Sequence, residues 1–396
     1  MKWPAQSRPV MNILFFQYGN YAEAYRRLQA GEPEVYRDQK KSVDYVASLS
    51  QRASVTTFAI CDEAHDVRLG AKLRSLGLPR DELDRAKIGE LFTEVSPNLV
   101  ICRTPYYEVL RQARTRRIRT LPCFADIFEN ASPRAFLRNV MLRRVLGMDL
   151  CPCVANHSLN ASQSVASSLH VSLDRIVPWD WSRVSGITSP KSMMVDARVP
   201  TALFVGVLSA EKGIGDCLEA AKYLHTRGIT LQMSFAGPGD AEPWRQLSER
   251  LGIAPFVRFL GLIPNSEVRQ QMRAHDIIVV PSRHSYSEGL PNTIYEALAS
   301  RSALIISDHP AFRGRLRPDL DCLVFEAAKA RSLANCIDRL CADRILYATL
   351  SANSLNALDS LYIGLEWSEL VELFLNDSRN STGWVEKHSL KTLRGG

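Results

Sequence analysis

Short apolar runs alternate with stretches of helical periodicity along most of the chain. Four apolar runs in the first part of the sequence predict buried strands, at residues 13–16, 56–60, 99–102 and 121–124. Residues 39–50 carry apolar side chains at helical spacing, and residues 21–28 form a more polar helix. Strands that alternate with helices indicate parallel sheets with helices on their faces. The pattern therefore predicts an α/β fold.

Residues 276–300 predict a strand, a loop and a helix in immediate succession. The apolar run 277–280 is typical of a buried strand, and Pro281 ends it because proline has no N–H to give to a sheet. Gly289-Leu290-Pro291 then opens a helix, with proline at the first helical position, where its missing N–H costs nothing.

Two carboxylates bracket the start of this helix. Glu288 precedes it, and Glu296 lies eight residues later, about one and a half turns inside at 3.6 residues per turn. The free N–H groups and positive dipole end of a helix N-terminus suit a phosphate. A phosphate with one acid beside it and one behind it fits a ligand that has a diphosphate and vicinal hydroxyls, such as a nucleotide-sugar. The alternative is a buried crossover helix with incidental acids.

The segment PS-(five residues)-EGLPNTIYEALA, which starts at Pro281, resembles the donor-site signature of the retaining family 4 glycosyltransferases. These enzymes have the GT-B fold, in which two Rossmann-like domains face a cleft and a C-terminal helix crosses back to the first domain. Their Glu, seven residues, Glu pattern is matched by Glu288 and Glu296. The resemblance implies that Glu288 lies by the donor sugar and that Glu296 binds the ribose hydroxyls. It also implies retention of configuration and independence of metal ions.

The length of 396 residues favours two domains. With the resemblance, we expect an acceptor-side Rossmann-like domain at 1–185 and a donor-binding domain at 186–364. Residues 365–396 are expected to be a crossover helix followed by a mobile tail, because the end of the chain is polar. A linker that contains Ser, Gly and Pro marks the boundary between the two domains, near residues 178–200.

The start of the second domain resembles a family segment in which an Arg and a Lys grip the diphosphate. This chain keeps Gly206 and Lys212 but has Val207 where the Arg is expected. Lys212 can stabilise the departing diphosphate as a compact charge, although a lone lysine is more often at the surface. Arg283, in the loop before Glu288, is a candidate substitute for the missing cation.

Further donor-binding positions are expected from the resemblance and, at residues 289–292, also from the start of the helix. They are Gly19 in the first domain and, in the second, Gly237, Arg258, Gly289, Leu290, Pro291 and Asn292.

The first domain departs from the family at the end of the run 121–124. Family members commonly carry a His there, and this chain has Ala125 followed by Asp126. Asp126 could hydrogen-bond a sugar or acceptor hydroxyl and assist proton transfer, or it could cap the segment that follows. His157 is the next histidine along the chain, and we assign it no role.

Composition limits the kinds of partner that the protein is expected to bind. A net charge of +7 suits an anionic ligand or surface, but no stacking aromatics interleave with the basic residues, so nucleic acid is not expected. Residues 134–150 are basic and amphipathic, which suits either an interfacial helix on anionic lipid or a core helix with a solvated arginine edge. No apolar run is long enough to span a membrane, and the N-terminus lacks signal-peptide features.

Nine cysteines without zinc spacing predict reduced thiols and no structural metal. We therefore expect a cytoplasmic enzyme that can also act at the inner face of the membrane, with no cofactor besides its nucleotide-diphosphate-sugar co-substrate. The expected reaction is transfer from a UDP- or GDP-sugar to a glycan or lipid-linked acceptor in cell-surface polysaccharide synthesis. A catalytically impaired nucleotide-sugar-binding module and a GT-B sugar-nucleotide epimerase stay open as alternatives.

Overall fold

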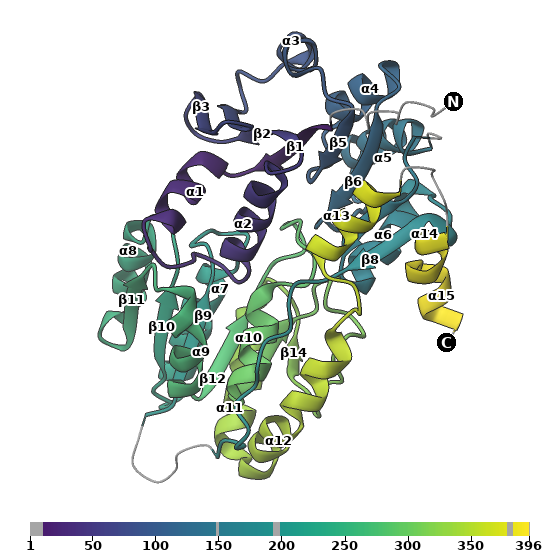
Figure 1. Cartoon of the computed structure of the whole chain (residues 1–396). Helices are drawn as coiled ribbons and strands as arrows, with labels where there is room; N and C mark the ends of the chain where they lie inside the picture. The colour runs from purple at the N-terminus through teal and green to yellow at the C-terminus, as the bar shows by residue number, and fades with distance from the viewer. Residues whose placement is uncertain (1–10, 148–149, 193–198, 378–382, 396) are drawn as a thin grey trace, which may run out of the picture. The chain divides into compact units, whose positions relative to one another are not determined.

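The computed structural model describes residues 11–147, 150–192, 199–377 and 383–395 (Figure 1). The chain forms two compact units. Unit 1 comprises residues 1–32, 38–180 and 363–396, and unit 2 comprises residues 33–37 and 181–362. Parts of four interpreted segments lie outside the described residues: the N-terminus at 1–10, the basic stretch at 148–149, the linker at 193–198 and the tail at 378–382 and 396.

Unit 1 contains an eight-stranded sheet within the described residues. Its strands are β1 (Asn12–Tyr18), β2 (Ser54–Ile60), β3 (His65–Gly70), β4 (Leu73–Leu78), β5 (Leu99–Cys102), β6 (Arg119–Phe124), β7 (Val154–His157) and β8 (Ile176–Trp179). They lie in the order β3-β4-β2-β1-β5-β6-β7-β8. All neighbours pair in parallel except β3 and β4, which form an antiparallel hairpin at one edge.

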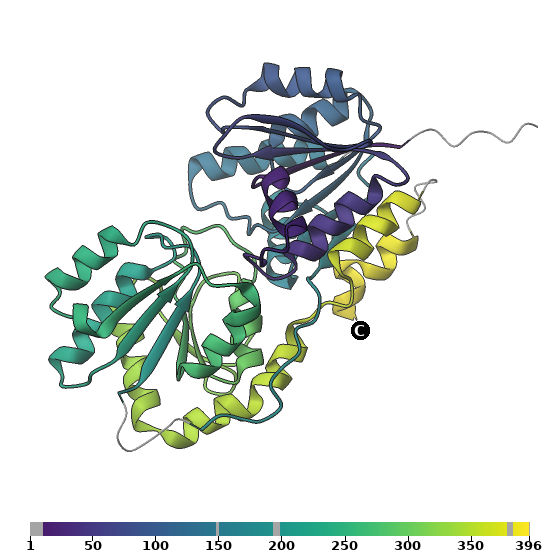
Figure 2. The same ribbon diagram turned by 60° about the vertical axis from the view of Figure 1, so that its left-hand side comes forward.

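Helices lie on both faces of this sheet (Figure 2). They are α1 (Tyr21–Gln29), α2 (Gln39–Leu49), α3 (Arg85–Val95), α4 (Tyr107–Thr115), α5 (Pro133–Leu146), α6 (Leu159–Leu169), the short 3-10 helix η1 (Leu173–Arg175), α13 (Trp367–Asn376), α14 (Gly383–His388) and α15 (Leu390–Gly395).

Unit 2 contains a six-stranded parallel sheet within its described part. Its strands are β9 (Thr201–Val205), β10 (Gln232–Ala236), β11 (Val257–Gly261), β12 (Ile277–Val280), β13 (Ala303–Ser307) and β14 (Leu323–Phe325), in the order β11-β10-β9-β12-β13-β14. Its helices are α7 (Ile214–Thr226), α8 (Glu242–Arg250), the 3-10 helix η2 (Ala254–Phe256), α9 (Asn265–Ala274), α10 (Asn292–Ser300), α11 (Ala330–Ala342) and α12 (Arg344–Leu361).

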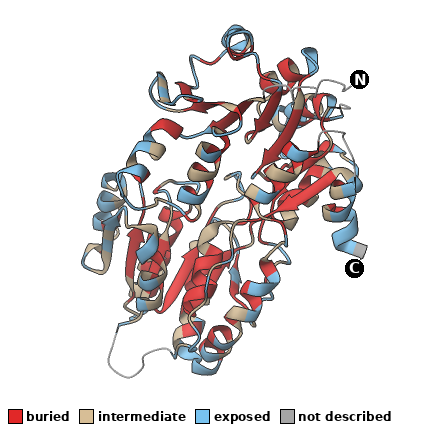
Figure 3. Ribbon diagram, viewed as in Figure 1, coloured by how far each residue is buried: buried red, intermediate tan, exposed pale blue. Residues whose placement is uncertain are grey.

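Each unit has its own apolar core between sheet and helices. In Figure 3 the central strands of both sheets are buried. Strands covered on both faces are continuously apolar rather than alternating, as in β12, whose four residues are all buried. The predicted α/β architecture with two parallel-sheet domains is confirmed.

Some local predictions need correction. The edge hairpin β3–β4 was not predicted, because its sequence HDVRLG is half polar and lacks the apolar run of a buried strand. Helix α10 begins at Asn292 with Pro291 at its N-cap, one position later than the predicted start. Strand β9 at the start of the second domain ends at Val205, because Gly206 turns out of the sheet with φ of 154°.

The C-terminal segment returns to unit 1. Trp367 of α13 meets the Tyr45 ring edge to face at 5.6 Å and lies under the Arg103 guanidinium at 4.5 Å. Beyond it, where a tail without structure was expected, Val385 and Leu390 are buried side chains on two short helices. Within the described residues, no helix combines the length and apolar composition needed to cross a membrane.

Candidate functional site

The candidate site of unit 2 lies at the point where the strand order reverses. Strands β9 and β12 are parallel neighbours, so the loops that leave their carboxyl ends, at 206–213 and 281–291, start side by side. In open α/β sheets, ligands bind at this edge and at this switch point. Arg283 N–H donates to the Glu211 carbonyl at 2.8 Å and joins the two loops directly.

Glycine permits the close approach of these loops. A Cβ on Gly213 would lie 2.3 Å from the Pro281 carbonyl oxygen, and Gly213 has φ of 80°. A Cβ on Gly237 would lie 2.0 Å from the carbonyl oxygen of Gly206. Any side chain at either position would push the backbone apart and open the site.

Lys212 and Glu288 form the centre of the site. The Lys212 ammonium pairs with Glu288 Oε2, and the two side chains are 13% and 12% exposed. The same ammonium lies 4.3 Å from the centre of the Tyr286 ring. Ser282 Oγ donates to the other oxygen of Glu288 at 2.6 Å. This arrangement holds one cation and one carboxylate, both partly reachable, at the mouth of α10.

The mouth of α10 offers an anion site. Pro291 stands at the N-cap, and no side chain caps the N–H groups of the first turn, of which that of Ile294 donates to the Pro291 carbonyl at 3.0 Å. Asn292 Oδ1 is buried and has no hydrogen-bond partner in the described structure. A buried acceptor that lacks a donor costs about 1–3 kcal/mol, and a ligand hydroxyl would satisfy it.

Arg283 is committed to another partner. Its Nε and a terminal nitrogen donate to the two oxygens of buried Asp216 on α7, at 2.9 and 2.6 Å. Such a bidentate pair is among the stronger side-chain contacts. Arg283 therefore holds the loop in position in this structure. Val207, where the resemblance led us to expect an Arg, is 44% exposed and supplies no charge.

We expect Arg283→Ala to lower stability more than ligand affinity. The change leaves the Asp216 carboxylate buried without its partner, which should cost about 1–3 kcal/mol because Arg283 is itself partly solvated. Urea unfolding measures this cost, and the double variant Arg283→Ala/Asp216→Ala should recover most of it. Unchanged stability together with a tenfold loss of nucleoside diphosphate affinity would instead make Arg283 the second phosphate ligand.

Glu296 is the fifth residue of α10, about one turn after its start, and is 6% exposed. Its Oε1 accepts a hydrogen bond from Asn265 Nδ2 at 2.8 Å. Burial raises the pKa of this carboxyl to about 7, against the smaller opposing effects of Asn265, Arg37 and Arg269. A carboxyl that can be kept neutral or ionised near neutral pH, next to a helix mouth, is typical of a functional position.

The structure does not bring all the predicted positions together. Most of them lie at one edge of the unit 2 sheet, where its strands end: Gly206, Lys212, Gly237, Arg283, Glu288 and the start of α10. Arg258 lies in the middle of the edge strand β11, exposed and separated from β12 by two strands.

Gly19 and Asp126 belong to unit 1. Gly19 follows β1 with φ of 82° and donates its N–H to the Ile60 carbonyl. Asp126 follows β6, and its backbone carbonyl accepts from Asn156 Nδ2 at 2.8 Å. Nearby, His157 Nε2 lies 3.2 Å from buried Asp180 Oδ1, at the carboxyl ends of β7 and β8.

Four polar residues of the unit 2 site were missed. Tyr286 and Ser282 lie inside the recognised signature, but their roles depend on how the loop folds over Lys212. Asp216 and Asn265 come from other parts of the sequence, and nothing local marks them as partners of Arg283 and Glu296. Within the described residues, no group of three or more His, Cys, Asp or Glu side chains could hold a metal ion.

Comparison with known proteins shows what the part of the chain that contains this site is similar to. Residues 199–343 match the family model for glycosyl transferases group 1. Alpha-D-kanosaminyltransferase of Streptomyces kanamyceticus is 27% identical over 156 residues, which make up 39% of this chain and 40% of that protein. Phosphatidyl-myo-inositol mannosyltransferase of Mycobacterium tuberculosis is 33% identical over 118 residues, 30% of each chain. The chain therefore matches less than half the length of these curated relatives.

Solved structures match over nearly the whole chain. Sucrose-phosphate synthase of Thermosynechococcus elongatus aligns with a TM-score of 0.64 at 17% identity, over 91% of this chain and 98% of that one. Anabaena HepE, solved with UDP and glucose, aligns with a TM-score of 0.64 at 14% identity, over 93% of this chain and 100% of that one. The chain thus has the GT-B fold, and its residues 199–343 are similar to the group 1 glycosyltransferases.

Proposed function

We propose that the protein is a retaining glycosyltransferase that moves a sugar from a UDP- or GDP-sugar to a glycan or lipid-linked acceptor. The observation that carries this proposal is the pairing of Lys212 with Glu288 at the uncapped mouth of α10. A cation, a set of helix N–H groups and a carboxylate within one small site match the diphosphate and sugar of such a donor.

Each group then has a separate task. Lys212 and the N–H groups at residues 289–292 stabilise the negative charge that grows on the diphosphate as the bond to the sugar breaks. Glu288, released from Lys212 by the arriving phosphate, accepts hydrogen bonds from the sugar hydroxyls. Glu296 accepts hydrogen bonds from the ribose. The acceptor hydroxyl attacks from the face the diphosphate leaves, and its proton passes to a phosphate oxygen of the departing group.

The relatives support this substrate class. The names of the curated relatives describe kanosaminyl and mannosyl transfer, and Amylovoran biosynthesis glycosyltransferase of Erwinia amylovora, 25% identical over 142 residues, acts in polysaccharide synthesis by its name. Anabaena HepE was solved with UDP-glucose as well as with UDP. We therefore favour a role in cell-surface polysaccharide or glycolipid synthesis.

Unit 1 is proposed to hold the acceptor. Asp126 follows strand β6 of its sheet, at the edge where parallel sheets bind ligands, and Gly19, which we propose as a donor-binding position, follows β1 at the same edge. Asp126 would hydrogen-bond an acceptor or sugar hydroxyl. The acceptor could be lipid-linked, so we further propose peripheral contact with the inner face of a membrane through residues 134–150, with the reaction in the cytoplasm.

Two observations favour a second candidate function, that of a nucleotide-sugar-binding module. Val207 and Ala125 stand where the family resemblance leads us to expect an Arg and a His, so the site could bind nucleotide-sugars without transferring them. A GT-B epimerase would act on the free nucleotide-sugar.

Incubation with a panel of UDP- and GDP-sugars, with and without a membrane extract as acceptor source, separates these functions. We expect release of one nucleoside diphosphate that depends on the extract, together with a product that keeps the anomeric configuration of the donor. Tight donor binding without turnover would support the binding module. Interconversion of the free nucleotide-sugar without extract would support the epimerase.

A further inference from the structure

Helix α5 of unit 1 combines exposed apolar side chains with a single sign of charge. Its sequence PRAFLRNVMLRRVL contains four arginines and no acidic residue. Phe136 and Leu137 are 57% and 60% exposed, far more than a structural role in the core would allow. Arg134 and Arg138 flank them and are exposed as well. An aromatic and a leucine set among arginines are typical of a helix that lies in a membrane interface.

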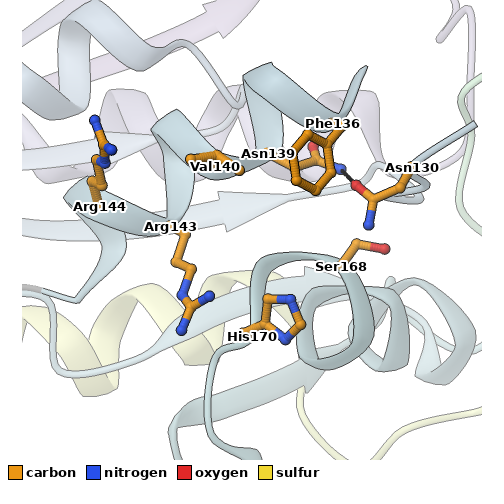
Figure 4. Close-up of a pocket in the computed structure, with 8 residues that line it drawn as sticks. All are labelled: Asn130, Phe136, Asn139, Val140, Arg143, Arg144, Ser168 and His170. Atoms are coloured by element: carbon orange, nitrogen blue, oxygen red, sulfur yellow. Dashed lines mark hydrogen bonds between the residues drawn. The ribbon is translucent and has the colours of Figure 1, made fainter. Parts of the chain in front are cut away.

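A pocket opens beside this face (Figure 4). It has a volume of about 370 Å³ and lies between α5 and the end of α6. Figure 4 shows the Arg143 guanidinium extending from α5 toward the His170 ring, with Asn130 and Ser168 at the other end of the pocket. Phe136 and Val140 supply an apolar wall, and none of the described residues that line the pocket is acidic.

Hydrogen bonds fix the polar end of the pocket. Asn139 Nδ2 donates to Asn130 Oδ1 at 2.9 Å, which orients the Asn130 amide so that its own nitrogen faces Ser168 in Figure 4. Ser168 Oγ donates to the Phe128 carbonyl at 2.8 Å. The pocket therefore presents a guanidinium, an imidazole and an amide nitrogen, which are hydrogen-bond donors for phosphate oxygens.

We propose that α5 and this pocket form a docking surface for an anionic phospholipid membrane, with a lipid phosphate in the pocket and Phe136 and Leu137 inserted among the acyl chains. The inference rests on the membrane contact of the proposed function and names the ligand that would provide it. A phosphodiester with apolar chains attached satisfies both halves of the surface, the arginines and the exposed apolar pair. A nucleic acid would satisfy only the arginines.

Sedimentation with lipid vesicles tests the docking surface on the full chain. We expect binding to vesicles that contain phosphatidylglycerol and weak binding to vesicles of phosphatidylcholine alone. Each arginine near an anionic surface should raise the vesicle partition coefficient about fivefold. Arg143→Gln/Arg144→Gln should therefore lower this coefficient about 25-fold. Phe136→Ser/Leu137→Ser should weaken it at least tenfold, because buried apolar side chains are lost from the bilayer.

The matched control is Arg85→Gln/Lys87→Gln on α3, which removes the same charge from exposed positions of unit 1. An equal loss in this control would mean that net charge alone drives binding and would overturn the proposal. So would tighter binding to single-stranded RNA than to vesicles, or no preference for anionic vesicles.

Stabilisation by nucleoside diphosphates is measured on the same proteins. It should be unchanged in all three double variants, since their residues lie in unit 1. Vesicle binding without any response to nucleotides would contradict the proposed function and leave the docking surface standing.

Discussion

Replacing Lys212 by alanine is expected to lower the rate of sugar transfer about 100- to 1,000-fold, the usual effect of removing one charge-stabilising donor from a reacting site. Lys212 is the cation that the structure places against Glu288, and Val207 supplies no charge at the position where we expected an Arg. Arg283 cannot compensate without leaving Asp216, to which it donates two hydrogen bonds. The loss should appear mainly in kcat, because the diphosphate carries its largest charge as it departs.

Lys222→Ala on α7 is the control for this variant. It removes a partly buried lysine of the same unit that the site does not use. Thermal unfolding should be similar for both variants. Transfer by Lys212→Ala within threefold of the unmodified protein would exclude Lys212 from the reaction.

Replacing Glu296 by glutamine is expected to change how stability depends on pH. The carboxyl has a folded-state pKa of about 7, raised by burial from 4.5. Below pH 4.5 the group is protonated in both states and contributes nothing. Between pH 4.5 and 7 the unfolded chain releases the proton and the folded chain keeps it, so stability falls as pH rises. Above pH 7 the full penalty is present, about 3 kcal/mol for this shift.

Urea unfolding at a series of pH values measures this effect. Glu296→Gln should match the unmodified protein near pH 4.5 and exceed its unfolding free energy by up to about 3 kcal/mol at pH 8. Glu249→Gln, an exposed acid on α8, should show no such pH-dependent difference. If the unfolding free energies of Glu296→Gln and the unmodified protein differ by the same amount at all pH values, burial does not raise the pKa of this carboxyl.

Ionisation of Glu296 should also affect nucleotide binding, in the direction opposite to its effect on stability. In the proposed site an ionised Glu296 would accept hydrogen bonds from both ribose hydroxyls, so nucleotide affinity should rise about tenfold between pH 6 and 8. The penalty that Glu296 imposes on the free protein is then relieved by the ligand. This trade of stability for affinity is typical of functional sites.

The sequence predicted helices and strands well where the spacing of apolar residues alone determines them. The run 277–280 is wholly apolar and is β12, and the region 39–50 has helical spacing and is α2 over residues 39–49. The edge hairpin β3–β4 escaped prediction because one face of an edge strand is solvated and its residues are mixed. Tail residues 383–395 became helical because Val385 and Leu390 are buried against unit 1, a contact no local pattern reveals.

The sequence indicated many of the residues of the candidate site but few of the contacts between them. Lys212 and Glu288 lie 76 residues apart, and they meet because β9 and β12 are neighbours at the switch point. Arg283 was a candidate phosphate ligand on charge and position, but its pairing with Asp216, 67 residues away, depends on how α7 packs. The raised pKa of Glu296 likewise depends on burial, which composition does not give.

Thermal stabilisation by a matched set of nucleotides tests the central claim most directly. The set contains UDP, GDP, ADP and dTDP, each beside its nucleoside, and the proteins are the unmodified chain, Lys212→Ala and Glu296→Gln. We predict that one nucleoside diphosphate at 100 times its dissociation constant adds about 2.7 kcal/mol of stability. Lys212→Ala should lose the advantage of the diphosphate over its nucleoside, and Glu296→Gln should weaken both. No stabilisation by any nucleotide, or equal stabilisation of all three proteins, would contradict the assignment of this site.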